Sequence, residues 1–347
     1  MNGFGQELRI TIRRLLSHPL YALLVISTLA VGVGLNTTMF SLVNAILMRP
    51  LAAKDPDRLV RIYGTTADRN RQSITYPDYL DFNEGSKVFS GLAATHLLVG
   101  VLETGNTSQQ VLAEAISTNY FEVLGISATM GRIFRSSDQY DSNVVIISHD
   151  LWKRSFQGGE DIIGRTLTLN RQIFTIAGVA PQSFHGTFAG VFPALWVPLV
   201  QTQGWLGPDW RTDRNVLRLH VIGRLAAGVN INEARAAIQT VARRLQNTFP
   251  DTNRERGADV EEARLLPGGL RGMVAVFLSL FLLIVGLVLL TVCANLGNFV
   301  FIRTLARRRE FSLRLALGAG RIHLLRKTFA ESLILSFAGG SAGLILA

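Results

Sequence analysis

Three stretches of the chain contain apolar and small residues but no charged side chain: residues 19–48, 273–302 and 332–347. A charge-free run of about 18 residues or more is long enough to cross a bilayer as a helix. The first two runs exceed this length, and the third stops where the sequence stops, so we predict transmembrane helices at residues 19–48, 272–302 and 328–347.

Residues 49–271 have a different pattern, in which short alternating and amphipathic segments follow one another. Residues 58–63 and 217–225 alternate in the manner of half-buried strands, and residues 144–147 and 174–179 are short β-branched runs. Residues 76–82, 150–156 and 232–245 predict helices, with Asp150 near the cap of the second. The third presents Ala234, Ile238, Val241 and Leu245 on one face.

These elements predict an α+β membrane protein, in which transmembrane helices flank a mixed α/β domain at residues 49–271. Residues 125–200 are rich in short strands, glycine and aromatic residues, whereas 50–115 and 215–265 carry strand and helix units. We therefore expect a β-rich lobe, at about residues 125–200, inserted into a discontinuous lobe.

The charge of the chain is concentrated in two short segments. The whole chain has 35 basic and 25 acidic residues, a net charge of +10. Residues 1–18 carry three arginines and one acid, and residues 303–327 carry eight basic residues and one acid, so together they hold nine of these ten charges. Basic residues concentrate in the short segments that stay in the cytoplasm. We therefore place both segments in the cytoplasm and the domain outside it.

Two other interpretations of these features are weaker. The basic composition would favour nucleic-acid binding, but the charge adjoins apolar runs instead of covering a domain face, so we expect no nucleic-acid partner. Residues 43–45 weakly resemble a signal-peptide cleavage site, but the first apolar run is longer than the roughly 7–15 residues of a signal peptide's core. We prefer a retained first helix.

The basic segment 303–327 also predicts a short amphipathic helix between two membrane spans. Its apolar residues would contact a partner, its glycine would end the helix, and its charged residues would set the orientation. The candidate coupling residues are Arg309, Glu310, Phe311, Leu313, Arg314, Leu317, Gly318 and Arg321. An apolar stripe on a cytoplasmic helix needs a docking partner, and the arginines also suit anionic lipid.

We find no catalytic or metal-binding motif in the sequence. A phosphate loop ends in Gly-Lys-Ser/Thr, but none of the four lysines follows a glycine. The run Ser148-His149-Asp150 has the residue types of a hydrolytic triad, yet three consecutive side chains point in divergent directions. The six histidines lack metal-ligand spacing, and the single cysteine, Cys293, excludes an intrachain disulfide.

Small residues four apart in the first apolar run predict close helix packing. Ala30 and Gly34 form one such pair, and Ser41 and Ala45 form another. Small side chains allow transmembrane helices to approach closely, although such residues also commonly face lipid.

Several of these segments carry a family resemblance. The run from Arg309 to Arg321, Glu331-Ser332-Leu333 and the glycine-rich residues 339–343 resemble the FtsX-like permease domain of MacB-type ABC transporters. Residues 32–44 and 49–51 resemble the first helix of that family, and residues 75–79, 119–125 and 195–199 resemble its periplasmic core domain. The sequence also resembles the duplicated, ATPase-less permeases of acidobacteria, and we expect a fragment truncated at its C-terminus.

The resemblance implies a multi-pass permease of the bacterial inner membrane, with a cytoplasmic N-terminus and a periplasmic core domain. It implies a separate ABC ATP-binding subunit that holds the ATP, contact with membrane lipid, a second permease half or a homodimer, and a periplasmic adaptor. It implies no cofactor bound by this chain. The expected function is to transmit an ATP-driven conformational change to the periplasmic domain for export or extrusion of a substrate.

Two alternatives remain open on the sequence. A signalling or regulatory module would activate a periplasmic partner without moving cargo, through the same coupling helix. A membrane-anchored enzyme is the third and weakest possibility.

Overall fold

The computed structural model describes residues 19–44, 51–68, 70–104, 107–139, 143–202, 204–207, 209–266, 268–306 and 321–347. The chain divides into two compact units. Residues 50–270 form one, which we call the core domain, and the helices before and after it form the other.

The helical unit contains α2 (Pro19–Val43), most of α8 (Gly268–Ala306) and α10 (Arg321–Leu346). In the part of the chain that the structure describes, Pro19–Val43 and Arg271–Phe299 are long and apolar enough to cross a membrane, and Ser332–Leu346 is a shorter apolar stretch. Large apolar side chains are exposed along all three helices. Such surfaces suit a lipid environment or further helices.

The bounds of the helices differ from those predicted. Helix α8 begins four residues before the predicted 272 and continues to Ala306, and α10 begins at Arg321 instead of 328. Both ends of the predicted separate helix 303–327 are thus continuous with the flanking helices. The limits predicted for these helices were too short because they were taken from the apolar runs, whereas the helices continue into the neighbouring polar residues.

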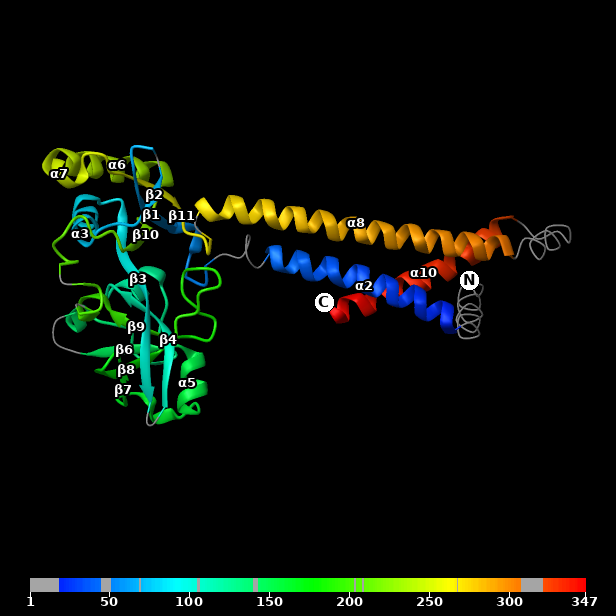
Figure 1. Ribbon diagram of the computed structural model, residues 1–347, viewed down its shortest axis with the longest axis horizontal. Helices are drawn as coiled ribbons and strands as arrows, with labels where there is room; N and C mark the ends of the chain where they lie inside the picture. The colour runs from blue at the N-terminus through cyan, green and yellow to red at the C-terminus, as the bar shows by residue number, and fades with distance from the viewer. Residues whose placement is uncertain are drawn as a thin grey trace. The chain divides into compact units, whose positions relative to one another are not determined.

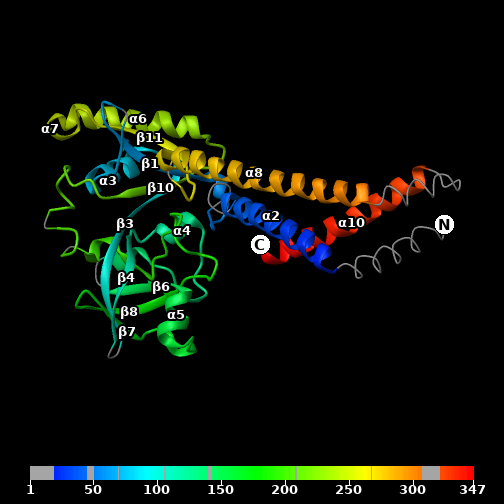
Figure 2. The ribbon, with the colours of Figure 1, turned by 45° about the vertical axis from the view of Figure 1, so that its right-hand side comes forward.

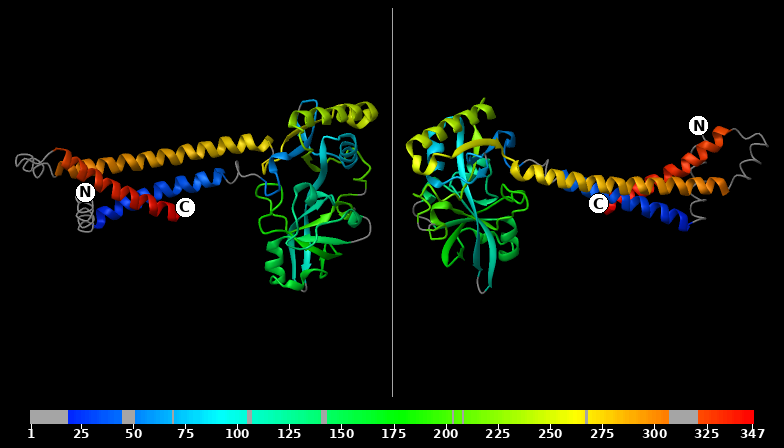
Figure 3. Two further views of the ribbon diagram at one scale, coloured as in Figure 1. Left: turned by 180° about the vertical axis from the view of Figure 1, so that it is seen from behind. Right: turned by 45° about the horizontal axis from the view of Figure 1, so that its top comes forward.

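Helices α2 and α10 pack against each other, and α2 also contacts α8 (Figures 1 and 3). Val25 and Leu29 of α2 are buried together with Leu335 of α10. Leu296 of α8 adds a partly buried side chain to this cluster.

The described part of the core domain contains one sheet of 11 strands. Its order is β11-β1-β10-β3-β4-β9-β6-β8-β5, with β2 paired to β1 and β7 paired to β3 and β8. The pairs β4–β9 and β6–β8 are parallel. The strands are β1 (Leu59–Thr65), β2 (Arg71–Gln72), β3 (Phe89–Thr104), β4 (Thr107–Ile116), β5 (Met130–Gly131), β6 (Val144–Ile147), β7 (Thr166–Leu169), β8 (Gln172–Val179), β9 (Leu195–Pro198), β10 (His220–Leu225) and β11 (Gly257–Glu262).

The strands of residues 125–200 lie together at one end of this order and continue the same sheet. The long hairpin of β3 and β4 connects the two ends, because β3 pairs with β10 near its start and with β7 near its tip. Two predicted strands begin later than expected: β10 begins at His220, so residues 217–219 lie outside it, and β1 begins at Leu59, because Arg58 belongs to a 3-10 turn.

Helices cover both faces of the sheet (Figure 2). They are α3 (Tyr76–Gly85), α4 (Tyr120–Leu124), α5 (His149–Phe156), α6 (Ile231–Thr248) and α7 (Pro250–Asn253), with short 3-10 turns η2 (Pro56–Arg58), η3 (Ser136–Gln139), η4 (Glu160–Ile162) and η5 (Leu199–Thr202).

The core domain has two apolar clusters, one on each face of the sheet. Val60 and Ile62 of β1 enter the cluster to which α3, α5 and α6 contribute, whereas Leu59 enters the one formed with α4. This division follows from the two-residue period of a strand. The second cluster holds the fully buried Trp196 and Phe121, whose rings meet at 5.6 Å.

Helix ends are fixed by local side chains. Asn230 and Glu233 form a capping box at the start of α6, whose buried face includes the four residues predicted from the sequence. At α5 the cap is Ser148, whose hydroxyl accepts from the Leu151 amide, and Asp150 lies near this cap in the first turn, as predicted. Ser148 occupies this role because the strand ends one residue before it and the helix begins one residue after it.

Candidate functional site

Most of the predicted coupling residues lie outside the described residues. Arg309, Glu310, Phe311, Leu313, Arg314, Leu317 and Gly318 fall within 307–320, which the structure does not describe. Arg321 is the first residue of α10.

The predicted packing residues of α2 fall in different environments. Ala30 is buried, and Gly34 faces α10, where an added Cβ would lie 3.2 Å from the Gly343 carbonyl oxygen. Ser41 is exposed, and Ala45 lies outside the described residues. In α10, a Cβ on Gly343 would come within 2.9 Å of the Ala30 carbonyl oxygen. A glycine at this position therefore allows the two backbones to approach closely.

Asn36 makes a contact between α2 and α8 that the sequence analysis missed. Its side-chain nitrogen donates to the carbonyl oxygens of Gly32 and Val285, each at 3.2 Å. A polar side chain within an apolar helix commonly bonds across a helix interface, so the presence of Asn36 in an apolar run was the available signal.

Where the core domain meets α8, a polar network fixes the first residue of that helix. The Gly268 amide donates to both Glu261 carboxylate oxygens at 3.2 Å. The guanidinium of Arg71 pairs with Glu261 at 2.6 Å and lies 4.1 Å from the centre of the Tyr63 ring. Burial, and then the nearby Asp259, raise the pKa of Tyr63. We call Tyr63, Arg71, Glu261 and Gly268 the junction network.

Arg61 lies beside this network and is buried, with 5% of its surface exposed. It is opposite Glu261 in the pairing of β1 and β11. Its Nη2 atom donates to the Thr187 carbonyl at 3.1 Å and to the Arg264 carbonyl at 3.4 Å. Burial lowers the pKa of Arg61, and the charge of Glu261 opposes this effect. Arg61 thus connects three segments that are distant in the sequence.

His220 and Phe188 complete the surroundings of Arg61. The Phe188 ring lies 4.3 Å from the Arg61 guanidinium and 5.0 Å from the His220 ring. Burial, and then the positive charge of Arg61, lower the pKa of His220 to about 4. The imidazole is therefore neutral near pH 7.

A second buried acid lies on the same face of the sheet. The Glu114 carboxylate accepts from the Trp196 indole at 2.8 Å, and both side chains are buried. Burial raises the pKa of Glu114, and the hydrogen bond from Trp196 opposes the shift. Burial also raises the pKa of Tyr120 well above its ordinary value.

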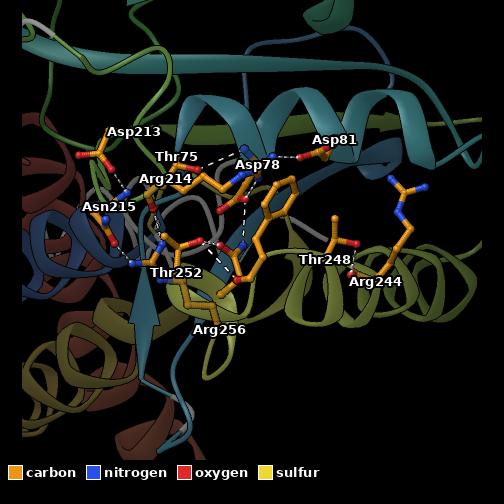
Figure 4. A network of polar contacts seen from close by, with 12 residues as sticks. Thr75, Asp78, Asp81, Asp213, Arg214, Asn215, Arg244, Thr248, Thr252 and Arg256 are labelled. Carbon is orange, nitrogen blue, oxygen red and sulfur yellow. Dashed lines mark hydrogen bonds and ion pairs between the residues drawn. The ribbon is translucent and has the colours of Figure 1, made fainter.

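A further polar network fixes α3 to the segments near α6 and α7 (Figure 4). Arg214 pairs with Asp78 and, at 2.7 Å, with Asp81, and its guanidinium lies 3.7 Å from the Phe249 ring centre. Asn253 donates to Asp78 at 3.0 Å. These contacts stabilise the packing of the helices on the sheet.

In the described ranges, no group of three or more His, Cys, Asp or Glu side chains is placed to hold a metal ion. The polar networks described above serve to join segments of the chain.

Two family models match separate parts of the sequence. That of the MacB-like periplasmic core domain matches residues 22–241, and that of the FtsX-like permease C-terminal matches residues 274–347. The chain belongs to the MacB/FtsX-like ABC permease family.

The macrolide export ATP-binding/permease protein MacB of Aggregatibacter actinomycetemcomitans is similar, at 21% identity over 82% of this chain and 42% of that protein. MacB of Neisseria gonorrhoeae is 20% identical over 98% of this chain and 52% of its own length. The crystal structure of the periplasmic region of MacB from Actinobacillus actinomycetemcomitans covers 65% of this chain and 94% of that one, at 16% identity and a TM-score of 0.44. The chain spans about half the length of the curated relatives it matches.

In this MacB/FtsX-like permease, the junction network includes residues from outside both matched regions. Glu261 and Gly268 lie between residues 241 and 274, whereas Tyr63 and Arg71 lie within the core-domain match. The network thus joins residues of the core-domain match to the segment that lies between the two matched regions.

Proposed function

We propose that this chain is the permease component of an ATP-driven system in the bacterial inner membrane. Helices α2, α8 and α10 span the membrane, residues 1–18 and the basic segment lie in the cytoplasm, and the core domain, with its β-rich lobe at about 125–200, lies in the periplasm. The positive charge of the two short segments and the exposed apolar surfaces of the helices support this arrangement.

The observation that carries the proposal is the continuity of α8. This helix of 39 residues begins at Gly268, which is bound to Glu261 of the core domain, and ends at Ala306, within the basic segment. At 1.5 Å per residue it is about 58 Å long, which exceeds a hydrocarbon core of about 30 Å. In this proposal, α8 is the element that transmits movement between the basic segment and the core domain.

In this proposal the basic segment binds a separate ATP-binding subunit. Phe311, Leu313 and Leu317 are the apolar anchors, Gly318 ends the docking segment, and Arg309, Glu310, Arg314 and Arg321 set its orientation. Movement of that subunit displaces α8 along its length, and the junction network passes the displacement to the core domain. The result is export or extrusion of a substrate. The partners in this process are a second permease half or a second copy of this chain, and a periplasmic adaptor.

The proposal is tested by ATP hydrolysis of the full-length permease reconstituted in lipid with its cognate ATP-binding subunit. We expect Phe311→Ala/Leu313→Ala to abolish most of the stimulation of hydrolysis, because buried anchors each contribute on the order of 1–2 kcal/mol to an interface. Arg307→Ala, which removes a charge of the basic segment outside the docking residues 309–321, is the control and should retain most of the stimulation. Equal stimulation by wild type and the double variant would refute the coupling role.

A further inference from the structure

The loop between β8 and β9, residues 181–193, is attached to the core domain around Arg61. The Thr187 carbonyl accepts from Arg61 at 3.1 Å, and the Phe188 ring lies 4.3 Å from the same guanidinium. The Ala189 amide donates to the Leu265 carbonyl at 2.9 Å. Three consecutive residues of the loop thus contact either Arg61 or the segment that follows β11.

The segment that follows β11 leads directly into α8, and Arg61 contacts it as well. Arg61 donates to the Arg264 carbonyl at 3.4 Å with the same nitrogen that reaches Thr187. The planar guanidinium can hold two carbonyl oxygens while stacking on an aromatic ring, which a lysine ammonium cannot do in the same way. One buried side chain therefore contacts both the loop and the start of the connection to α8.

The same loop forms one wall of a pocket of about 250 Å³ in the core domain. The loop contributes Gln182, Phe184, His185, Phe192 and Pro193, and α5 and β4 supply the facing residues, which include His149, Arg154 and Gln110. The Phe192 side chain is 64% exposed. A displacement of residues 187–189 would shift this wall relative to α5. Helix α5 is held separately, because its Leu151 and Trp152 pack in the apolar cluster to which α3 and α6 contribute.

We propose that Arg61 is the positioning residue through which a displacement of α8 reaches the loop 181–193, so that the shape of the pocket follows the movement of the helix. The inference rests on the proposed function, which supplies the ATP-driven displacement of α8. It adds the path inside the core domain: from residues 263–265, through Arg61, to residues 187–189 and the wall of the pocket.

The test is hydrogen exchange of the full-length permease in nanodiscs with its ATP-binding subunit, with and without a non-hydrolysable ATP analogue. In wild type, we expect the analogue to change exchange in both 263–266 and 181–193. Arg61→Met should keep the response in 263–266 and lose it in 181–193. It should also speed exchange of the Ala189 amide on the order of tenfold without nucleotide, because the loop loses its attachment.

Arg58→Met is the matched control, because Arg58 also donates to a backbone carbonyl, that of Leu225 at 2.6 Å, but does so away from the loop. It should respond as wild type does in both segments. An Arg61→Met protein that keeps the response in 181–193 would overturn this inference alone. A wild-type protein with no response in 263–266 would overturn the proposed function and this inference with it.

Loss of protection throughout β3 and β4 in Arg61→Met would indicate a misfolded domain. In that case Arg61→Lys, which keeps the charge, is the variant that tests the role of Arg61. We expect Arg61→Lys to retain protection in these strands and to show a smaller nucleotide response in 181–193. A full wild-type response in the lysine variant would contradict the role of the guanidinium.

Discussion

Replacing Arg214 by methionine should strongly destabilise the core domain. The Asp78 side chain is 9% exposed, and among the described residues Asn253 is the side chain that would still donate to its carboxylate. Breaking a buried ion pair by removing one partner typically costs about 3–5 kcal/mol, because the other charge stays buried. Asp81, the second partner, is 26% exposed and can regain water, so we take the lower end, about 3 kcal/mol.

The assay is thermal unfolding of the excised core domain, residues 50–270, which is a compact unit with its own two apolar clusters. For a domain of this size, 1 kcal/mol shifts Tm by about 2–4 °C, so Arg214→Met should lower Tm by about 6–12 °C. Arg154→Met is the control, because Arg154 and Asp150 form an exposed pair with 79% and 53% of their side chains in solvent. Such a pair contributes about 0.3–0.5 kcal/mol.

The reasoning would be refuted if Arg214→Met lowered Tm no more than Arg154→Met. The double variant Asp78→Asn/Arg214→Met provides a second check. Because it removes the buried charge along with its partner, it should recover part of the lost stability.

Two further predictions concern His220 and Gly343. Because the pKa of His220 is lowered to about 4, the folded domain binds fewer protons than the unfolded chain between pH 6.5 and 4; its stability should fall as pH drops through this window, by at most about 1.4 kcal/mol per pH unit. Denaturant unfolding of His220→Gln should show a flatter pH dependence than wild type or the exposed-residue control His185→Gln, and an unchanged slope would contradict the burial of a neutral imidazole. In the helical unit, Gly343→Leu should separate α2 from α10 and lower the thermal stability of the full-length protein in detergent, since a Cβ there would lie 2.9 Å from the Ala30 carbonyl oxygen. Gly340→Leu, where a Cβ would meet nothing within 4 Å, should have little effect, and equal losses in both variants would argue against this interface.

Local patterns in the sequence were sufficient to predict several elements. The apolar runs marked the three described helices of the helical unit, and the 3.6-residue period marked the buried face of α6. Both signals come from residues close together in the chain, so neither needs tertiary information. The ends of α8 were missed because its first and last turns lie outside the apolar run.

The contacts of Arg61 could not be predicted in this way. In residues 58–63 its alternation with apolar neighbours favours a solvent-facing side chain, yet Arg61 is buried because the loop 181–193 covers that face. Its two hydrogen-bond partners are 126 and 203 residues away in the sequence. A strand's period indicates which residues share a face, but it does not indicate which distant segment covers that face.

Placement of the core domain and the basic segment on opposite sides of the membrane is tested most directly by cysteine labelling in intact cells. Asp68 and Ser137 are exposed in the core domain, and Ser312 belongs to the basic segment. In a Cys293→Ser background, Asp68→Cys and Ser137→Cys should react with a membrane-impermeant maleimide, whereas Ser312→Cys should react only after the membrane is permeabilised. Labelling of Ser312→Cys in intact cells, with Asp68→Cys and Ser137→Cys protected, would contradict the proposed transmission from the cytoplasm to the core domain.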